Sequence, residues 1–324
     1  MKDYFSEEVK KTVDDIKNKE YDLCFAMLTD TRLCDAGEDT RENIGAVDGQ
    51  IGFDFIVHLG NIINGDNPRD ISMHLMQTEI EKYRKAVKSA KVFVAQGERD
   101  GYRDERFIGQ LAKNIMYDEL WYKHTGMYDE EYGISRPENK PYYYVDLPQK
   151  KVRLIVLCAY YSQYDEENGL YEKYTGIDTA QAAWLKNTAL SVPAGTTVLI
   201  FSHAIPKSRF ENGAGPFVYE GFSTEPILMI LQNAQKSGIE IACWFGGGYN
   251  CDADIVAGGV NYAVISSQLA ERNSRAKCED VRVLQNRTEG TVGYDCWDAV
   301  SVNLEKREIM MHRFGCGEDR VLHY

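Results

Sequence analysis

Strand-like apolar runs alternate with helix-like segments along the first hundred residues, and this alternation limits the possible folds most. Apolar residues recur at spacings of three and four in the helical segments and run almost without interruption in the strands. The expected elements are a charged amphipathic helix at 5–18, strands at 21–28, 53–60 and 91–97, and helices at 40–50 and about 71–89. Because strand–helix–strand connections join parallel neighbours, the pattern predicts an α/β fold with a mostly parallel sheet.

The rest of the chain continues without an internal repeat, a low-complexity tract or a linker. We expect a β-hairpin from YYYVDL and VRLIVLCAYY (142–147 and 152–161), helices at 178–190 and 224–237, and strands at 196–202, 239–246 and near 261–266, 281–285, 296–303 and 308–315. The chain is therefore expected to form a single domain over 1–324. Within it we distinguish an N-terminal helix in 1–20, a Tyr-rich insertion at 100–150 and C-terminal strands in 280–324.

The chain is acidic, with 37 Lys and Arg residues against 50 Asp and Glu residues and a formal net charge of −13. Such a chain has no general attraction for nucleic acid or anionic lipid. No apolar run reaches the ~20 residues that cross a bilayer, and the N-terminal sequence lacks the apolar core of a signal peptide. We therefore expect no nucleic-acid partner, no membrane contact and a cytoplasmic location.

Polar residues follow five of the expected strands. The five blocks are Asp30-Thr31-Arg32, Gly60-Asn61, Gly97-Glu98-Arg99-Asp100, His203, and the segment from Gly247 to Asp252. Functional residues of open α/β sheets gather where strands end and loops begin. The five blocks therefore predict one site at the carboxyl ends of the strands.

In their order and spacing the blocks resemble the calcineurin-like metallophosphoesterases. That family uses D-x-H, G-D, G-N-H-D, a lone His after a strand, and G-H-x-H. The segments HLGNIING, QGERDG and FSHAIP resemble the family's surroundings, and HRFGCGEDR is similar to the ending of a bacterial branch. The resemblance covers about residues 20–320. It implies a four-layer α/β/β/α sandwich with mixed sheets, and hydrolysis of phosphoesters by two metal ions.

The metal ligands that the resemblance implies are mostly replaced. Only Asp30 and His203 keep the family residue among the seven ligand positions. The other five positions hold Arg32, Asn61, Glu98, Gly248 and Asn250. Arg99 stands where the family has its proton-handling His. The resemblance therefore implies catalytic positions at His203 and Arg99, but with a degenerate centre.

These replacements remove the charges that a dinuclear centre needs. Two dications ~4 Å apart repel by roughly 16 kcal/mol at an effective dielectric constant near 20, and a neutral Asn61 cannot offset this. The guanidinium of Arg32 is always charged and has no lone pair to offer. We expect no cofactor, or at most a single Mn, Mg or Zn ion at the residual positions Asp30, Asn61, Glu98 and His203.

Two metal-free interpretations of the site stay open. In one, the acids Asp30 and Glu98 simply pair with Arg32 and Arg99. In the other, an arginine keeps donors free for a small phosphorylated or anionic ligand. The candidate ligand-binding residues are Arg32, Arg99, Asn61, Gly248 and Asn250, with Gly246-Gly247-Gly248 as a possible backbone cradle. The expected function is then a divergent, non-catalytic or weakly active binding protein.

The alternative function is an active phosphoesterase for monoesters or diesters that uses one metal ion or a rearranged centre.

Other residues have plainer interpretations. Asp35, Asp66 and Asp100 are expected to be solvated loop carboxylates, and His58 a structural residue beside the site. The Tyr-rich stretch 115–145 is expected to line a groove or to pack a hairpin.

Overall fold

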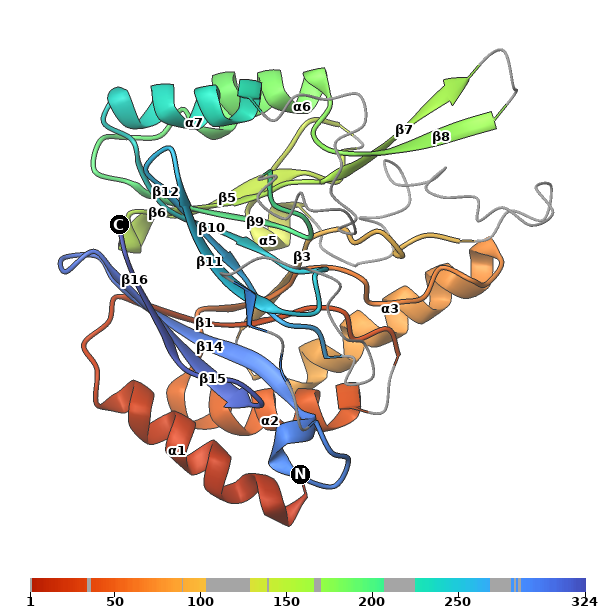
Figure 1. Cartoon of the computed structure of the whole chain (residues 1–324), viewed down its shortest axis with the longest axis vertical. Helices are drawn as coiled ribbons and strands as arrows, with labels where there is room; N and C mark the ends of the chain where they lie inside the picture. Colours follow the sequence, from red (N-terminus) through yellow and green to blue (C-terminus); the bar gives the residue numbers. More distant parts are fainter. Residues whose placement is uncertain are drawn as a thin grey trace.

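The protein is a four-layer sandwich in which two β-sheets lie face to face and helices cover the outer face of each (Figure 1). The computed structural model describes residues 2–33, 36–88, 90–102, 129–138, 140–165, 170–206, 225–268, 281–282, 284 and 287–324. Asp35 and the part of the Tyr-rich stretch at 115–128 lie outside these residues.

The first sheet has six strands in the order β16-β15-β14-β1-β2-β3. Its strands are β1 (Leu23–Leu28), β2 (Phe55–His58), β3 (Lys91–Val94), β14 (Cys296–Asn303), β15 (Glu308–Gly315) and β16 (Arg320–His323). β1, β2 and β3 are parallel, whereas β14 runs antiparallel to β1. Both faces of β1 are covered, and this explains why its sequence is an uninterrupted apolar run.

The second sheet has eight strands in the order β13-β11-β12-β10-β9-β6-β5-β4. Its strands are β4 (Ile134–Ser135), β5 (Tyr143–Leu147), β6 (Val152–Val156), β9 (Thr197–Ser202), β10 (Glu240–Gly246), β11 (Asp252–Ala257), β12 (Val260–Val264) and β13 (Val281–Arg282). β6, β9, β10 and β12 are parallel, and the others are antiparallel. β7 (Tyr160–Asp165) and β8 (Leu170–Thr175) form a separate ribbon.

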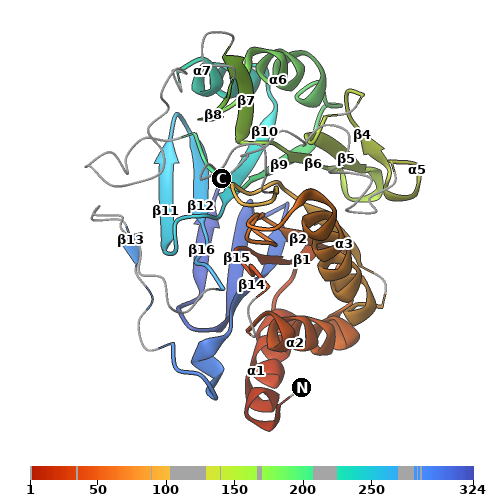
Figure 2. The same cartoon turned by 90° about the vertical axis from the view of Figure 1, so that its right-hand side faces the viewer.

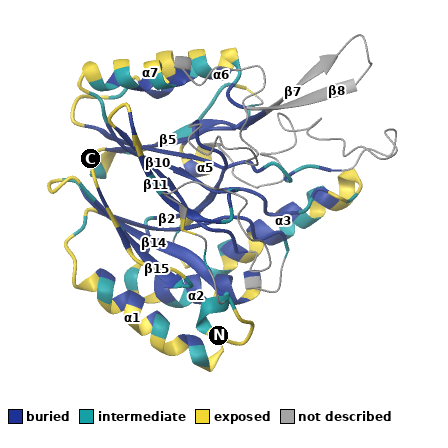
Figure 3. Cartoon of the chain, viewed as in Figure 1, coloured by how far each residue is buried: buried dark blue, intermediate teal, exposed yellow. Residues whose placement is uncertain are grey.

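Helices cover each sheet on its outer side (Figures 1 and 2). α1 (Ser6–Lys17), α2 (Ala36–Ile51) and α3 (Arg69–Ala86) lie on the six-stranded sheet. α6 (Thr179–Trp184), which continues as a π-helical turn (Leu185–Ala189), and α7 (Glu225–Lys236) lie on the other. Figure 3 shows their buried sides facing the sheets. The short helices are Asp3–Phe5, α5 (Asp129–Tyr132), Pro148–Lys150 and Val292–Tyr294.

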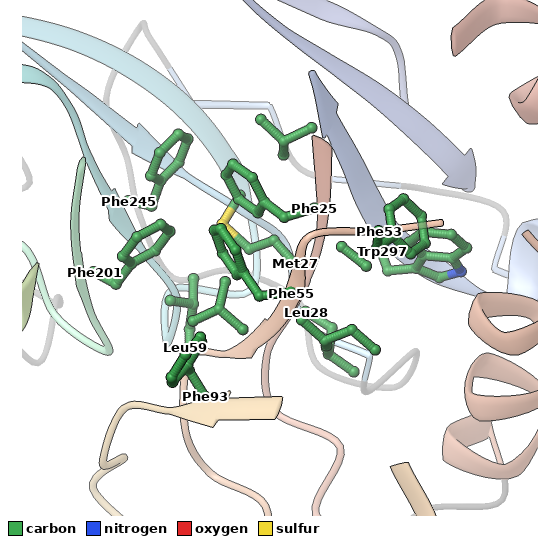
Figure 4. Packing of buried hydrophobic residues seen from close by; sticks show 14 of the residues in the cluster. Phe25, Met27, Leu28, Phe53, Phe55, Leu59, Phe93, Phe201, Phe245 and Trp297 are labelled. Carbon is green, nitrogen blue, oxygen red and sulfur yellow. The ribbon is translucent and has the colours of Figure 1, made fainter. Parts of the chain in front are cut away.

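Four phenylalanines fix the two sheets against each other (Figure 4). Phe25 stacks on Phe55 in the first sheet at 4.5 Å between ring centroids, and Phe201 stacks on Phe245 in the second at 5.3 Å. The two pairs meet edge to face. Burying a Phe side chain stabilises a fold by about 1.5–3 kcal/mol, so this cluster holds the strand ends that carry the site in register.

A buried ionic cluster makes a second link between the sheets. Arg313 of β15 donates to Asp298 of β14 at 3.0 Å and to Asp252 of β11 at 2.8 Å. Arg320 of β16 adds a bond to Asp254 at 3.0 Å. The arginines of the HRFGCGEDR tail therefore have a structural role.

The expected helices and strands match the observed ones in type, but one expected strand is divided, and α5, β4, β8, β11 and β16 are elements that were not expected. The run 152–161 is not one strand, because β6 ends at Val156 and β7 begins at Tyr160. β11 begins inside a polar block and β16 has four residues, so neither carries a strong strand signal in the sequence. Among the described residues no helix is both long and apolar enough to cross a membrane.

Candidate functional site

The five predicted blocks meet where the parallel strands of both sheets end. The loops after β1 and β2 lie together, since the Asp30 N–H donates to the Gly60 carbonyl at 3.0 Å. The loop after β10 crosses to the first sheet, where the Gly248 N–H donates to Asp30 Oδ2 at 3.2 Å. The sequence therefore placed these loops in one site correctly.

The backbone of this site is unusual. Among the described residues, seven that are not glycine have positive φ, and five of them belong to these loops: Asp30, Arg32, Leu33, Asn61 and Asn250, with φ between 44° and 60°. The left-handed region is unfavourable for side chains other than Asn, Asp and Gly. Such strain concentrates at functional positions, where the surrounding contacts enforce it.

Asn61 lies at the centre of the site. Its Nδ2 donates to Asp30 Oδ1 at 2.8 Å and lies 3.0 Å from His203 Nε2. Its Oδ1 accepts the backbone N–H of Arg99 at 2.7 Å. Because that N–H can only donate, the oxygen must face Arg99 and the NH₂ group must face Asp30 and His203. One amide thus connects the two side chains that keep the family residue.

The same contacts define the hydrogen-bonding state of His203, which is buried. Its Nδ1 lies 2.7 Å from the Leu59 carbonyl, which can only accept, so Nδ1 carries a proton. Its Nε2 then presents a lone pair to the Asn61 amide. In this arrangement the ring is neutral, and its lone pair is already used.

Asp30 is fully buried and both its carboxylate oxygens are occupied. Oδ1 accepts from Arg32 Nη2 at 2.7 Å and from Asn61, while Oδ2 accepts from Thr29 Oγ1 at 3.0 Å and from Gly248 N–H. Burial acts to raise the pKa of Asp30, but the neighbouring His203, the Arg32 guanidinium and the Asn61 amide outweigh it and lower that pKa. The carboxylate is therefore ionised at neutral pH.

Arg32 is only 8% exposed, although its charge is permanent. Nη2 bonds to Asp30, and the backbone N–H donates to the Asn61 carbonyl at 3.1 Å. Nε and Nη1 are buried, and no described residue accepts a hydrogen bond from them. An unmet buried donor costs about 1–3 kcal/mol, so these N–H groups are the open donors of the site.

Glu98 and Arg99 lie half-buried beside this centre. The predicted cluster of two acids and two arginines is observed only in part, as the Asp30–Arg32 pair. Arg99 contributes its backbone N–H to Asn61, but its side chain makes no ion pair with a described residue.

Burial, followed by the nearby charge of Glu98, raises the pKa of Tyr160 well above its ordinary value.

A backbone cradle for a phosphate at Gly246-Gly247-Gly248, which the sequence left open as one possibility, is wrong. The Gly247 N–H donates to the His203 carbonyl at 2.9 Å and the Gly248 N–H donates to Asp30, so neither is free for a phosphate. A Cβ on Gly248 would lie 2.6 Å from His203 Nε2, which explains the glycine. Two residues further on, Asn250 Oδ1 is buried and has no hydrogen-bond partner among the described residues.

Asp100 was expected to be solvated, and this is also wrong. It is 2% exposed. Its carboxylate accepts four backbone N–H groups, from Asn61, Ile62, Ile63 and Gly97, at 2.7–3.1 Å. Burial raises the pKa of Asp100 despite these bonds. The carboxylate ties the loop after β2 to the loop after β3, whereas Asp66 is exposed as expected.

His58 has the structural role that the sequence indicates. Its Nδ1 accepts the Gly60 N–H at 3.1 Å, so the proton of the neutral ring is on Nε2, 3.1 Å from Thr31 Oγ1. Burial lowers the pKa of His58 to about 3. The ring is neutral at physiological pH and supports the loops on both sides of it.

This donor set does not fit the family's dinuclear metal centre. The acceptor sites of Asp30 and the lone pair of His203 are filled by protein donors, and Asn61 turns its NH₂ group toward both. The residual single-metal site at Asp30, Asn61, Glu98 and His203 meets the same obstacle. Within the described ranges no group of three or more His, Cys, Asp and Glu residues is placed to hold a metal.

Comparison with known proteins gives structural matches alone. No protein-family model and no curated protein sequence matches the chain. A dimetal phosphatase from Danio rerio (LOC 393393) matches with a TM-score of 0.60 at 14% identity, over 94% of this chain and 100% of that one. Plasmodium GAP50, described as the anchor in the inner membrane complex, matches with a TM-score of 0.51 at 13% identity, over 93% and 88%.

At these identities the likeness concerns the fold. The dimetal phosphatase is similar along its whole length, and the layer order and the two mixed sheets are those that the sequence predicted. This chain therefore has the four-layer fold of the calcineurin-like metallophosphoesterases.

Proposed function

We propose that this chain binds a small anionic or phosphorylated ligand without a metal ion and does not hydrolyse it. The observation that carries the proposal is the position of the Asn61 amide, which donates to both Asp30 and His203. A two-metal phosphatase needs free lone pairs on its ligands to hold the ions that activate water. Here those lone pairs accept hydrogen bonds from the protein.

Arg32 is the proposed ligand contact. Its Nε and Nη1 groups are buried donors without a described partner, and guanidinium groups recognise oxyanions well. The half-exposed Arg99 and Asn250 complete the ligand set. Asn61 and Gly248 are assigned a positioning role instead, because their N–H groups already bond to Asp30.

The two structural relatives support a separation of this fold from its chemistry. One is described as a dimetal phosphatase and the other as an anchor in a membrane complex. A fold does not by itself dictate an activity, which depends on the side chains at the site. A binding role on a phosphatase-like fold is therefore compatible with both.

The hydrolysis test uses protein purified without chelator, with 4-nitrophenyl phosphate and bis(4-nitrophenyl) phosphate as substrates and added Mn²⁺. We expect no turnover above that of a His203→Ala variant. Turnover that is lost in His203→Ala would overturn the proposal and favour a phosphoesterase with a rearranged metal centre.

The binding test titrates phenyl phosphate into the protein by calorimetry in the presence of EDTA. We expect binding by the wild type and at least about tenfold weaker binding by Arg32→Lys, which keeps a positive charge near Asp30 but lacks the planar donors. The exposed Arg307→Lys variant is the matched control. Equal affinity of the wild type and Arg32→Lys, or no binding by either, would contradict the proposal.

A further inference from the structure

The open donors at Arg32 define one half of a ligand contact. Nη2 is fixed on Asp30 at 2.7 Å, and the backbone of Arg32 is bonded to Asn61, so the guanidinium is held in place. Nε and Nη1 remain as two buried N–H donors that no described residue satisfies. These two N–H groups point in different directions on the planar guanidinium, so an oxyanion could accept from either of them through an unprotonated oxygen.

Asn250 supplies a group of the opposite kind. Its loop is joined to the Asp30 loop by the bond from Gly248 N–H to Asp30 Oδ2, and Asn250 follows Gly248 by two residues, as Arg32 follows Asp30. Asn250 Oδ1 is a buried acceptor without a described partner. It repels an unprotonated oxygen, but it can accept a hydrogen bond from a P–OH group.

The charge of the site favours a ligand with a single negative charge. Asp30 and Arg32 cancel, and His203 is neutral as hydrogen-bonded. At the rim Glu98 and Arg99 also sum to zero. The cost of removing an ion from water increases with the square of its charge, so a dianion costs about four times as much to bury as a monoanion. Asp100 adds a further buried carboxylate, bonded to the Asn61 backbone N–H, so the site has no net positive charge that could compensate for that difference.

On the basis of the proposed function, we infer that the site selects the singly protonated monoanion of a phosphate or phosphomonoester. Arg32 Nε or Nη1 donates to one of its unprotonated oxygens, and Asn250 Oδ1 accepts the hydrogen bond of its P–OH group. Asn250 thereby discriminates a protonated phosphate from a sulfate, which has no proton at these pH values.

The test compares phenyl phosphate with phenyl sulfate, two probes of similar size, by calorimetry in EDTA at pH 5.5, 6.5 and 7.5. The second pKa of a phosphomonoester is about 6, so we expect phenyl phosphate affinity to fall about tenfold per pH unit above it. We expect phenyl sulfate to bind at least about tenfold more weakly at pH 5.5, since it has no hydroxyl to donate to Asn250 Oδ1 and leaves that buried acceptor unpaired. Its affinity should not follow the same pH dependence, which controls for titration of His203, Glu98 and the other groups of the site.

The variant Asn250→Ala isolates the acceptor. We expect it to lose about tenfold in phenyl phosphate affinity at pH 5.5 and to bind phenyl sulfate within about twofold of the wild type. Asn233→Ala, on the exposed side of α7, is the matched control. Equal affinity for both probes, or tighter phenyl phosphate binding at pH 7.5 than at 5.5, would overturn the inference while Arg32-dependent binding still supports the proposed function. Absence of binding to either probe would overturn both.

Discussion

Asn61 Nδ2 lies 3.0 Å from His203 Nε2, with the amide as donor and the imidazole as acceptor. The same nitrogen donates to Asp30 Oδ1 at 2.8 Å. An amide NH₂ group, which has hydrogens to donate and no lone pair available to accept, therefore takes the contacts that a cation would make with these two side chains.

The variant Asn61→Asp removes both donated bonds and places a second carboxylate against Asp30. Two carboxylates in contact share a proton, so their joint pKa is raised in the folded state. Because this joint pKa is higher in the folded state than in the unfolded chain, the pair stabilises the fold at a pH below the unfolded value. This contribution is lost as the pH rises through the folded value. We expect a loss of about 3–5 kcal/mol in the free energy of unfolding at pH 7.5, with a smaller loss at pH 4.5, measured by urea denaturation. Asn233→Asp is the control, and an unchanged stability at pH 7.5 would contradict the assignment of the amide.

The variant Asp30→Asn leaves the Arg32 guanidinium buried without its anion. We expect a loss of about 3–5 kcal/mol at pH 7. The pKa of Asp30 is lowered in the fold, so the stability it contributes is present above the unfolded value of about 3.9. That contribution disappears as the pH falls through the folded value. The double variant Asp30→Asn/Arg32→Met should recover more than half of the loss in urea denaturation, whereas additive effects would show that the two side chains are not coupled.

His58 makes the stability of the wild type depend on pH, because this histidine is buried as a neutral base. Its pKa is about 3 in the fold and about 6.5 in the unfolded chain. Between these values the unfolded chain binds one more proton, so the free energy of unfolding falls by about 1.4 kcal/mol per pH unit as the pH decreases. His58→Gln keeps a donor and an acceptor without this proton. We expect its stability relative to the wild type to improve from pH 6.5 to 5.0 in urea denaturation, with the exposed His323→Gln as control; parallel pH curves would contradict this.

Alanine substitutions at Gly248 and Gly195 distinguish the cost of backbone strain from the cost of side-chain crowding. Their φ values are +77° and +76°, but a Cβ meets His203 Nε2 at 2.6 Å only at Gly248, whereas nothing lies within 4 Å of one at Gly195. We expect Gly195→Ala to cost about 1–2 kcal/mol from the left-handed backbone. Gly248→Ala should cost about 1–3 kcal/mol more, because His203 or the loop must move. Equal losses in thermal or urea unfolding would show that the loop yields freely.

Arg313 and Arg282 allow a buried ion pair to be compared with an exposed one. The Arg313 side chain is 1% exposed and bonds to Asp252 and Asp298, while the Arg282 side chain is 49% exposed and pairs with Asp254. We expect Arg313→Met to lower the free energy of unfolding by about 3–5 kcal/mol because two buried carboxylates lose their cation. Arg282→Met should cost at most about 1 kcal/mol. Similar losses for the two variants would contradict a linking role for Arg313.

The sequence predicts the layers of this fold from the periodic spacing of its apolar residues. It predicts the meeting of the five loops from the polar residues that follow the strands. It could not predict the direction of the Asn61 amide, which depends on the Arg99 N–H of another loop. Asp100 was misjudged for the same reason, since its four backbone donors come together only in three dimensions. In the sequence, Gly248 is recognised only as a missing metal ligand. The structure shows that a glycine is required there, because a Cβ would collide with His203.

The left-handed residues Asp30, Arg32 and Asn61 are held by bonds among themselves and their loops. In a metalloenzyme the bound ions contribute to the stability of such loops, so the amount of correctly folded protein depends on what the cell supplies. Here the cross-links are synthesised with the chain. Under the proposed metal-free function, a cell starved of transition metals would still assemble this site completely, and a chelator would not destabilise it.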